Sequence, residues 1–163
     1  MIPETLLNEI GNRKCWVNYS ARKIPINPKT LHNASVSISA TWSDYHTAAL
    51  NIGKLASLKI GKDKRQDEII LGVGLILGEP SGLCGIDLDH VISEDGRIDP
   101  EALEIIRQMN SYTEYSPSGT GIHILFRGKT PVTGSKVIVN GKSREMYGGK
   151  RFFTVTGDVY EYD

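Results

Sequence analysis

The stretch from Leu83 to Ile92 constrains the fold of this chain most strongly, because it alternates apolar residues with two carboxylates, Asp87 and Asp89. Successive side chains of a β-strand point to opposite faces, so the pattern predicts a strand with both acids on one face and Ile86 and Leu88 directed into a core. Two neighbouring carboxylates repel each other unless a cation lies between them. The strand is therefore a candidate divalent-metal site; two solvated acids on the open face of an antiparallel strand are the alternative.

The composition describes an ordinary globular protein of one domain, with 163 residues, 39% hydrophobic and 23% charged. A formal net charge of zero gives no general attraction to nucleic acid, so any polyanion binding depends on local basic clusters. Cys15 and Cys84 cannot form a four-cysteine zinc site or a disulfide framework, so we expect no structural zinc. No apolar run has the length of a membrane span, and the N-terminus has no signal-peptide pattern, so we expect a cytoplasmic protein without membrane contact.

Hydrophobic periodicity and turn residues predict an α+β fold, with a largely antiparallel sheet covered by a few helices. The expected helices are 2–10, 45–56 and 99–109. The expected strands are 15–19, 69–77, 83–92, 112–116, 121–127, 137–139, 142–147 and 151–156. The two strands within 69–92 are predicted to pair as a β-hairpin, and the charged stretch 59–67 is predicted to be an exposed loop. A tight turn is expected at Asn140-Gly141.

A third carboxylate is needed if the acidic pair serves phosphoryl transfer. Two metal ions about 3.5–4 Å apart stabilise the attacking and leaving oxygens in such reactions, and they usually need more than two acidic ligands. Glu145 is the candidate, because it lies in the middle of a predicted strand. Glu114, in the strand before a glycine loop, is a weaker competitor.

The second candidate site is a loop with two glycines and two hydroxyls, Ser118-Gly119-Thr120-Gly121, followed by His123. Backbone N–H groups of such a loop can approach an anion closely, and His123 can donate to the same phosphate. The alternative is a turn followed by a half-buried histidine. No P-loop motif occurs in the chain, which excludes P-loop ATPase chemistry, and no G-x-G-x-x-G precedes a helix, which disfavours a dinucleotide fold.

Basic residues surround the predicted Glu145 strand, either as surface charge around a hairpin or as contacts to a triphosphate and a template backbone. They are Lys136, Lys142, Arg144, Lys150 and Arg151. Farther upstream, Lys23 and Lys29, with the aromatic residues Trp16 and Tyr19, can add an edge that contacts a nucleotide or a strand, although Trp16 also suits a core.

Taken in order, these segments resemble the primase-polymerase domain of the archaeo-eukaryotic primase superfamily, and most closely the bifunctional primase-polymerases at the N-termini of phage and plasmid replication proteins. The segments that carry the resemblance are 72–77, 85–90, 116–123, 144–147 and 151–157, with Trp16, 23–29 and 41–43 upstream. The resemblance implies an RRM-like primase catalytic core over residues 1–163.

The resemblance also implies roles for individual residues. Asp87 and Asp89 resemble the first metal-binding motif and Glu145 the third acidic position, which together would bind two Mg²⁺ or Mn²⁺ ions. Ser118 and His123 resemble the motif that contacts the phosphates of the incoming nucleotide, with Gly119 and Gly121 in the same loop. The remaining implied contacts are Lys142, Arg144 and Arg151 to the triphosphate, and Lys23, Lys29 and Lys150 to template and primer.

The implied activity is that of a DNA primase/polymerase, a template-directed nucleotidyltransferase of phage, plasmid or mobile-element replication in a bacterial or archaeal host. Its partners would be a single-stranded template with a primer, a (d)NTP and a helicase. Related proteins continue into a helical priming domain and a helicase, so we expect a fragment of a larger protein or a minimal standalone version. The alternatives are a non-catalytic module that binds single-stranded DNA or an origin, and a metal-dependent nuclease. Nicking initiators use a metal-binding histidine pair, and the four histidines form no H-x-H motif, which disfavours that subclass.

Overall fold

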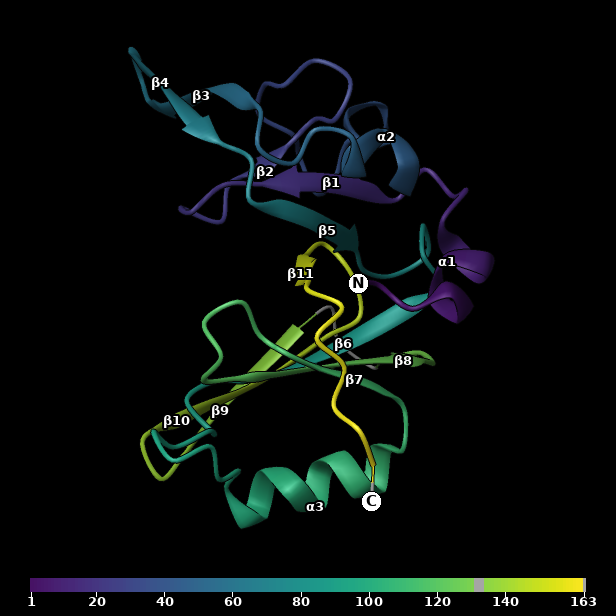
Figure 1. Ribbon diagram of the computed structural model, residues 1–163, viewed down its shortest axis with the longest axis vertical. Coiled ribbons are helices and arrows are strands. Elements are labelled where there is room, and N and C mark those ends of the chain that lie inside the picture. Colours follow the sequence, from purple (N-terminus) through teal and green to yellow (C-terminus); the bar gives the residue numbers. More distant parts are fainter. Residues whose placement is uncertain (131–133, 163) are drawn as a thin grey trace.

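The computed structural model describes residues 1–130 and 134–162, and it confirms the predicted α+β class. Two antiparallel sheets lie one above the other, and the long helix α3 (Pro100–Met109) covers the outer face of the lower sheet (Figure 1). The sequence predicts one sheet, so the division of the strands between these two sheets and a separate two-stranded hairpin is a difference from that expectation. Within the described residues, no helix is long and apolar enough to span a membrane.

The upper sheet has the strand order β11-β5-β1-β2. Its strands are β1 (Trp16–Tyr19), β2 (Pro25–Ile26), β5 (Gly72–Ile76) and β11 (Phe152–Val155). β1 is buried along its whole length, and its Trp16 and Val17 belong to one apolar cluster with residues of the helices α1 (Glu4–Ile10) and α2 (Tyr45–Ala49). The Trp16 indole N–H donates to the Ile10 carbonyl at 3.0 Å, and the Asn18 amide donates to the Ala48 carbonyl at 2.8 Å, so buried polar groups tie this sheet to both helices.

The lower sheet has the order β7-β8-β6-β10-β9, with the acidic strand at its centre. Its strands are β6 (Leu83–Leu88), β7 (Tyr112–Tyr115), β8 (Ile122–Arg127), β9 (Gly134–Val139) and β10 (Lys142–Tyr147). Ile86 and Leu88 pack with Ala102 and Ile106 of α3 in one apolar cluster, which confirms the predicted inward face of the strand. The helix over 100–109 and the turn at Asn140-Gly141 are also confirmed.

The prediction that residues 69–92 form a β-hairpin is wrong. β5 pairs with β1 on one side and with β11 on the other, so it has no free edge to offer β6. The chain leaves β5 through Gly78, which has a φ of +94°, makes one isolated bridge to Leu83, and enters the other sheet as the partner of β8 and β10. The connection from β5 to β6 therefore joins the two sheets instead of closing a hairpin.

The predicted exposure of 59–67 is confirmed, but the predicted loop is wrong, because this stretch lies in a two-stranded hairpin of β3 (Leu55–Gly61) and β4 (Lys64–Ile69). Ala56 and Leu58 are buried against Ile26 and Ile70, so one face of β3 supplies apolar packing that the charged residues obscure in the sequence. The predicted 45–56 helix ends at Ala49, and a turn that includes Gly53, with a φ of +88°, leads from it to β3. The short 3₁₀ turn Ser39–Thr41 precedes it.

Gly85 lets the two sheets approach each other at the centre of β6. A Cβ atom at this position would overlap the ring of Phe153, which extends from β11 above it. The Phe153 ring also packs against the His123 imidazole, with 4.9 Å between ring centroids. The absence of a side chain at Gly85 thus sets the height at which β11 lies over the acidic strand.

Replacing Gly85 with alanine should destabilise the fold by about 1–3 kcal/mol, because backbone or ring must shift to accommodate the new methyl group. Urea denaturation measures the change in the free energy of unfolding. Gly61→Ala is the matched control, since its Cβ would meet only the Lys64 Cβ at an ordinary 3.8 Å and should change stability by less than about 0.5 kcal/mol. Equal stability of Gly85→Ala and wild type would contradict this account of the sheet packing.

Candidate active site

A row of ionisable side chains crosses the lower sheet from one edge to the other. The register places Lys136 opposite Glu145, Glu145 opposite Asp87, Asp87 opposite His123, and His123 opposite Glu114. Directly opposed residues of antiparallel strands share a face of the sheet. Because Gly85 shares this face and lies under Phe153, the row points toward the upper sheet.

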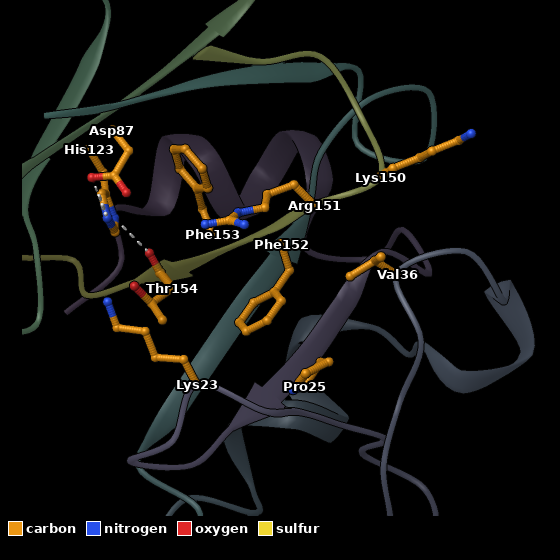
Figure 2. Close-up of a pocket in the computed structure, with 10 residues that line it drawn as sticks. All are labelled: Lys23, Pro25, Val36, Asp87, His123, Lys150, Arg151, Phe152, Phe153 and Thr154. Carbon is orange, nitrogen blue, oxygen red and sulfur yellow. Dashed lines mark hydrogen bonds and ion pairs between the residues drawn. The ribbon is translucent and has the colours of Figure 1, made fainter. Parts of the chain in front are cut away.

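A cavity of about 280 Å³ opens between the two sheets above the middle of this row. Figure 2 shows Asp87 and His123 at one end, with Thr154 of β11 beside His123, and Phe152 of the same strand farther along, towards Pro25. Lys23 extends from the turn before β2 toward the same end, whereas Lys150 points away from it (Figure 2). The cavity is therefore lined by the Asp87 carboxylate at one end and by basic and aromatic side chains along its wall.

Asp87 is the carboxylate of the row with an unsatisfied oxygen. Its side chain is 15% exposed, and its Oδ1 atom is buried without a hydrogen-bond partner, 3.6 Å from Nε2 of His123. Burial raises the pKa of Asp87, and the charges of Asp89 and Glu145 raise it further, against the opposing charges of His123 and Lys23. An unpartnered carboxylate oxygen beside other acids is a suitable ligand for a hard divalent cation.

Asp89 follows directly after β6 and is partly exposed. Its backbone N–H donates to the Ser143 carbonyl at 3.1 Å, which holds this end of β6 against β10. The Asp89 charge contributes to the raised pKa of Asp87, so the two carboxylates interact as the D-x-D spacing predicts.

Glu145 lies beside Asp87 but already has partners. The residue is 6% exposed; Oε1 receives hydrogen bonds from Lys136 at 2.8 Å and from Ser143 at 2.9 Å, and Oε2 receives one from Tyr147. Burial acts to raise the pKa of Glu145, but the hydrogen bonds from Lys136, Tyr147 and Ser143 lower it to about 2. Glu145 is therefore an ionised group whose charge is balanced by an exposed lysine.

In this arrangement, residues 1–130 and 134–162 contain no group of three or more His, Cys, Asp or Glu side chains placed to hold a metal ion together. Magnesium sites commonly use one or two carboxylates and take their other ligands from water and substrate phosphates. Asp87 and Asp89 fit that type of site.

His123 is held on several sides. Its Nδ1 atom lies 3.1 Å from the Thr154 carbonyl, which only accepts, so Nδ1 carries the hydrogen and donates. Glu114 Oε1 lies 3.8 Å from the same nitrogen, and Phe153 packs on the ring. These contacts leave Nε2 as the edge of the imidazole that faces Asp87 and the cavity.

Glu114 does not act as the competing third acid of a metal site in this geometry. It is 1% exposed and accepts hydrogen bonds from the backbone N–H groups of Thr156 and Gly157 and from the Tyr112 hydroxyl. These three donors stabilise the buried charge without a metal. Its contribution to the site is to anchor the turn after β11 next to His123.

Arg151 lines the cavity and interacts with the Glu145 strand. Its guanidinium lies over the Tyr147 ring at 4.6 Å from the centroid and 3.8 Å from Oε2 of Glu145. Lys23 and Lys150 both have positive φ values, 55° and 51°, which are uncommon for residues other than glycine and concentrate at functional sites.

The structure does not bring every predicted phosphate contact to this cavity. Lys142 and Arg144 lie on the opposite face of β10 from Glu145, where Lys142 binds Asp99 at 2.6 Å and Arg144 lies 3.9 Å from both Asp99 and Glu101. Strand alternation could have revealed this, since both differ in parity from Glu145.

The glycine loop lies at the end of the lower sheet where β6 stops, because the Thr120 carbonyl accepts a hydrogen bond from the Ile92 N–H. Ser118 bonds to the hydroxyls of Ser116 and Thr120 on an exposed surface. Ser118, Gly119 and Gly121 therefore lie near Asp89 and outside the cavity wall. Lys29 is also outside it, donating to the Ala40 carbonyl.

Sequence reasoning missed the upper wall of the cavity. Pro25, Val36, Phe152, Phe153 and Thr154 reach it from the other sheet and its loops. Most of them lie in the segments 23–29 and 151–157, but their place on the cavity wall depends on how the two sheets stack.

Comparison with known proteins identifies one relevant relative. No protein-family model matches the chain. Over 149 residues, which are 90% of its length, the chain is 31% identical to the DNA primase-polymerase of Nitratiruptor phage NrS-1. This confirms the predicted resemblance to a phage primase-polymerase. The chain spans 19%, about a fifth, of the phage protein's length.

Replacing Asp87 with asparagine should raise the melting temperature at pH 7, because it removes a charge that burial disfavours. The pKa of Asp87 in the folded state is above its unfolded value of about 3.9. Below about pH 3.9 the carboxyl is protonated in both states, so its charge does not affect stability. As the pH rises through the folded-state pKa, ionisation of Asp87 destabilises the fold. Melting temperatures measured between pH 3 and pH 8 should show a gain that disappears in acid.

The exposed Asp63→Asn variant is the control for this measurement and should melt like wild type throughout. A stability gain for Asp87→Asn that is equally large at pH 3 and pH 7 would show that the Asp87 charge is not its cause.

Proposed function

We propose that this chain is the catalytic domain of a DNA primase/polymerase, a template-directed nucleotidyltransferase that uses (d)NTPs. The observation that carries the proposal is the buried, unpartnered Asp87 oxygen beneath a cavity with a basic wall. A substrate that is both metal-bound and polyanionic, as a nucleoside triphosphate is, matches that combination. The similarity to a phage DNA primase-polymerase supports the same activity and an RRM-like primase core.

In this proposal Asp87 and Asp89 hold Mg²⁺ or Mn²⁺ through hard oxygen ligands, and the substrate phosphates complete the coordination. Glu145 joins them as a third acid when Lys136, its exposed partner, moves away. When bound, the cations would lower the pKa of the primer 3′-hydroxyl and would stabilise the charge on the pyrophosphate leaving group. The proposed catalytic residues are Asp87, Asp89 and Glu145, with His123 beside them.

The remaining groups position the triphosphate by electrostatics, without a covalent intermediate. Arg151 and Lys23 reach the cavity as cations, and the Nε2 edge of His123 faces it. Ser118, Gly119 and Gly121, at the Asp89 end of the sheet, are placed for phosphate or primer contact just outside it. Lys142 and Arg144 act indirectly, by fixing β10 to the start of α3.

The proposed nucleic-acid partners are a single-stranded template and its primer. Lys150, which points out of the cavity, and Lys29 are the proposed backbone contacts beyond the nucleotide. The phage relative is about five times longer than this chain, so a helicase partner and de novo priming are proposals about a larger protein.

Asp87→Ala and Asp89→Ala should each reduce primer extension by on the order of 100-fold or more, because each removes a ligand for the charge that develops in the transition state. Extension of a labelled primer on a DNA template with dNTPs or NTPs and Mn²⁺ measures the loss. Circular dichroism should show that both variants stay folded. Asp63→Ala, an acid on the hairpin tip, is the matched control and should extend the primer like wild type.

The same assay separates the alternative functions. Full extension by either variant would contradict the proposal. A primer shortened by wild type, and not by Asp87→Ala, would identify a nuclease that uses the same acids. Binding of single-stranded DNA without any incorporation would identify a non-catalytic module.

A further inference from the structure

A second hollow, of about 510 Å³, lies at the β3–β4 hairpin, outside the site described above. Its wall consists of His32 and Asn33 from the loop after β2 and Lys59 and Arg65 from the hairpin. The hairpin projects from the upper sheet on the side away from α3 (Figure 1). The hollow is open and carries two cationic side chains and an imidazole.

Arg65 is fixed in position by neutral groups. Its Nε donates to the Ser57 hydroxyl at 3.2 Å, and its Nη2 donates to the Ser57 carbonyl at 2.9 Å. Nδ1 of His32 lies 3.1 Å from both Nη2 and that carbonyl. The guanidinium is therefore oriented in advance, and none of these acceptors neutralises its charge.

Lys59 is held directly opposite Arg65 in the register of the hairpin. Like charges that face each other across strands destabilise a sheet, so this pair is unfavourable unless an anion lies between them. In the described part of the chain, no carboxylate lies within 4.0 Å of either cation; the next acid on this face, Asp67, is opposite Ser57. Asn33 bonds to both the N–H and the carbonyl of Lys59, which fixes the wall of the hollow.

The hollow is close to the active-site cavity along the chain. Asn33 lines the hollow and Val36 lines the cavity, and three residues span at most about 11 Å. One nucleic-acid strand rises about 3.4 Å per phosphate, so this separation corresponds to about three nucleotides. On the other side, Arg22 pairs with Glu68 and joins the hairpin to the turn that carries Lys23.

We propose that the Lys59/Arg65 hollow binds backbone phosphates of the single-stranded template, a few nucleotides from the site of synthesis. The proposal deepens the proposed function and rests on it for the identity of the strand. The paired cations without an acidic partner supply the affinity, and the fixed Arg65 presents its Nη1 N–H donors to a phosphate. The cavity then receives the nucleotide while the hairpin holds the strand that is read.

The test is binding of a fluorescently labelled poly-dT oligonucleotide by anisotropy, without metal or nucleotide, over a range of salt concentrations. Lys59→Ala/Arg65→Ala should bind about tenfold more weakly at low salt. Its plot of log affinity against log salt should flatten by about 0.7 per lost phosphate contact. Lys62→Ala/Lys64→Ala removes the same charge from the tip of the same hairpin, outside the hollow, and should bind within twofold of wild type.

Arg65→Lys separates loss of charge from damage to the fold, because it keeps the positive charge. It should bind the oligonucleotide more tightly than Lys59→Ala/Arg65→Ala and more weakly than wild type. Equal losses in the two double variants, wild-type affinity in Lys59→Ala/Arg65→Ala, or no binding by wild type at low salt would each overturn the proposal. Because no nucleotide is present, the result is independent of incorporation. A chain that fails to extend primers can still bind through the hollow, and a chain that extends them can still fail this test.

Discussion

The arrangement of this protein depends on one unfavourable interaction, the burial of the Asp87 carboxylate between two sheets without a partner for one of its oxygens. The position follows from packing. β6 is the central strand of the lower sheet, its Ile86–Leu88 face rests on α3, and its other face is covered by β11 through the Phe153–Gly85 contact. An acid on that second face is enclosed whether or not its carboxylate has a partner. The fold tolerates the unpartnered oxygen of Asp87 because the other acids of the row, Glu114 and Glu145, accept hydrogen bonds.

The three carboxylates in the row illustrate how environment separates chemically similar groups. Both carboxyl oxygens of Glu114 accept hydrogen bonds from backbone N–H groups or a hydroxyl, and the residue serves packing. Glu145 is held ionised by Lys136 and two hydroxyls, with a pKa of about 2. Asp87 has a histidine at 3.6 Å, two neighbouring acids and the charge of Lys23, but no hydrogen bond to its Oδ1 atom. A group left in this state is unfavourable for stability and available for ligands, which is typical of functional sites.

Local pattern was sufficient for part of this description. Alternation in β6 predicted the faces of Asp87 and Ile86, and Asn140-Gly141 predicted the β9–β10 turn that brings Glu145 back along the sheet. The pairing of strands was not accessible, because the patterns of β5 and β6 do not say whether the two strands pair with each other. Only the occupied edges of β5 send β6 to another sheet. The cross-strand row and the basic hollow likewise depend on registers between segments distant in sequence, which no local spacing encodes. Charged residues concealed the β3–β4 hairpin, since its apolar face belongs to one strand.

The central claim is that Asp87 and Asp89 together bind a divalent cation under the cavity. The most direct measurement is anomalous diffraction at the manganese edge from crystals grown with Mn²⁺ and a non-hydrolysable dNTP. The account predicts an anomalous peak at coordination distance, about 2.1 Å, from oxygens of both Asp87 and Asp89, with the nucleotide phosphates on its other side. Manganese bound elsewhere, or a nucleotide bound with Asp87 and Asp89 free of metal, would contradict it.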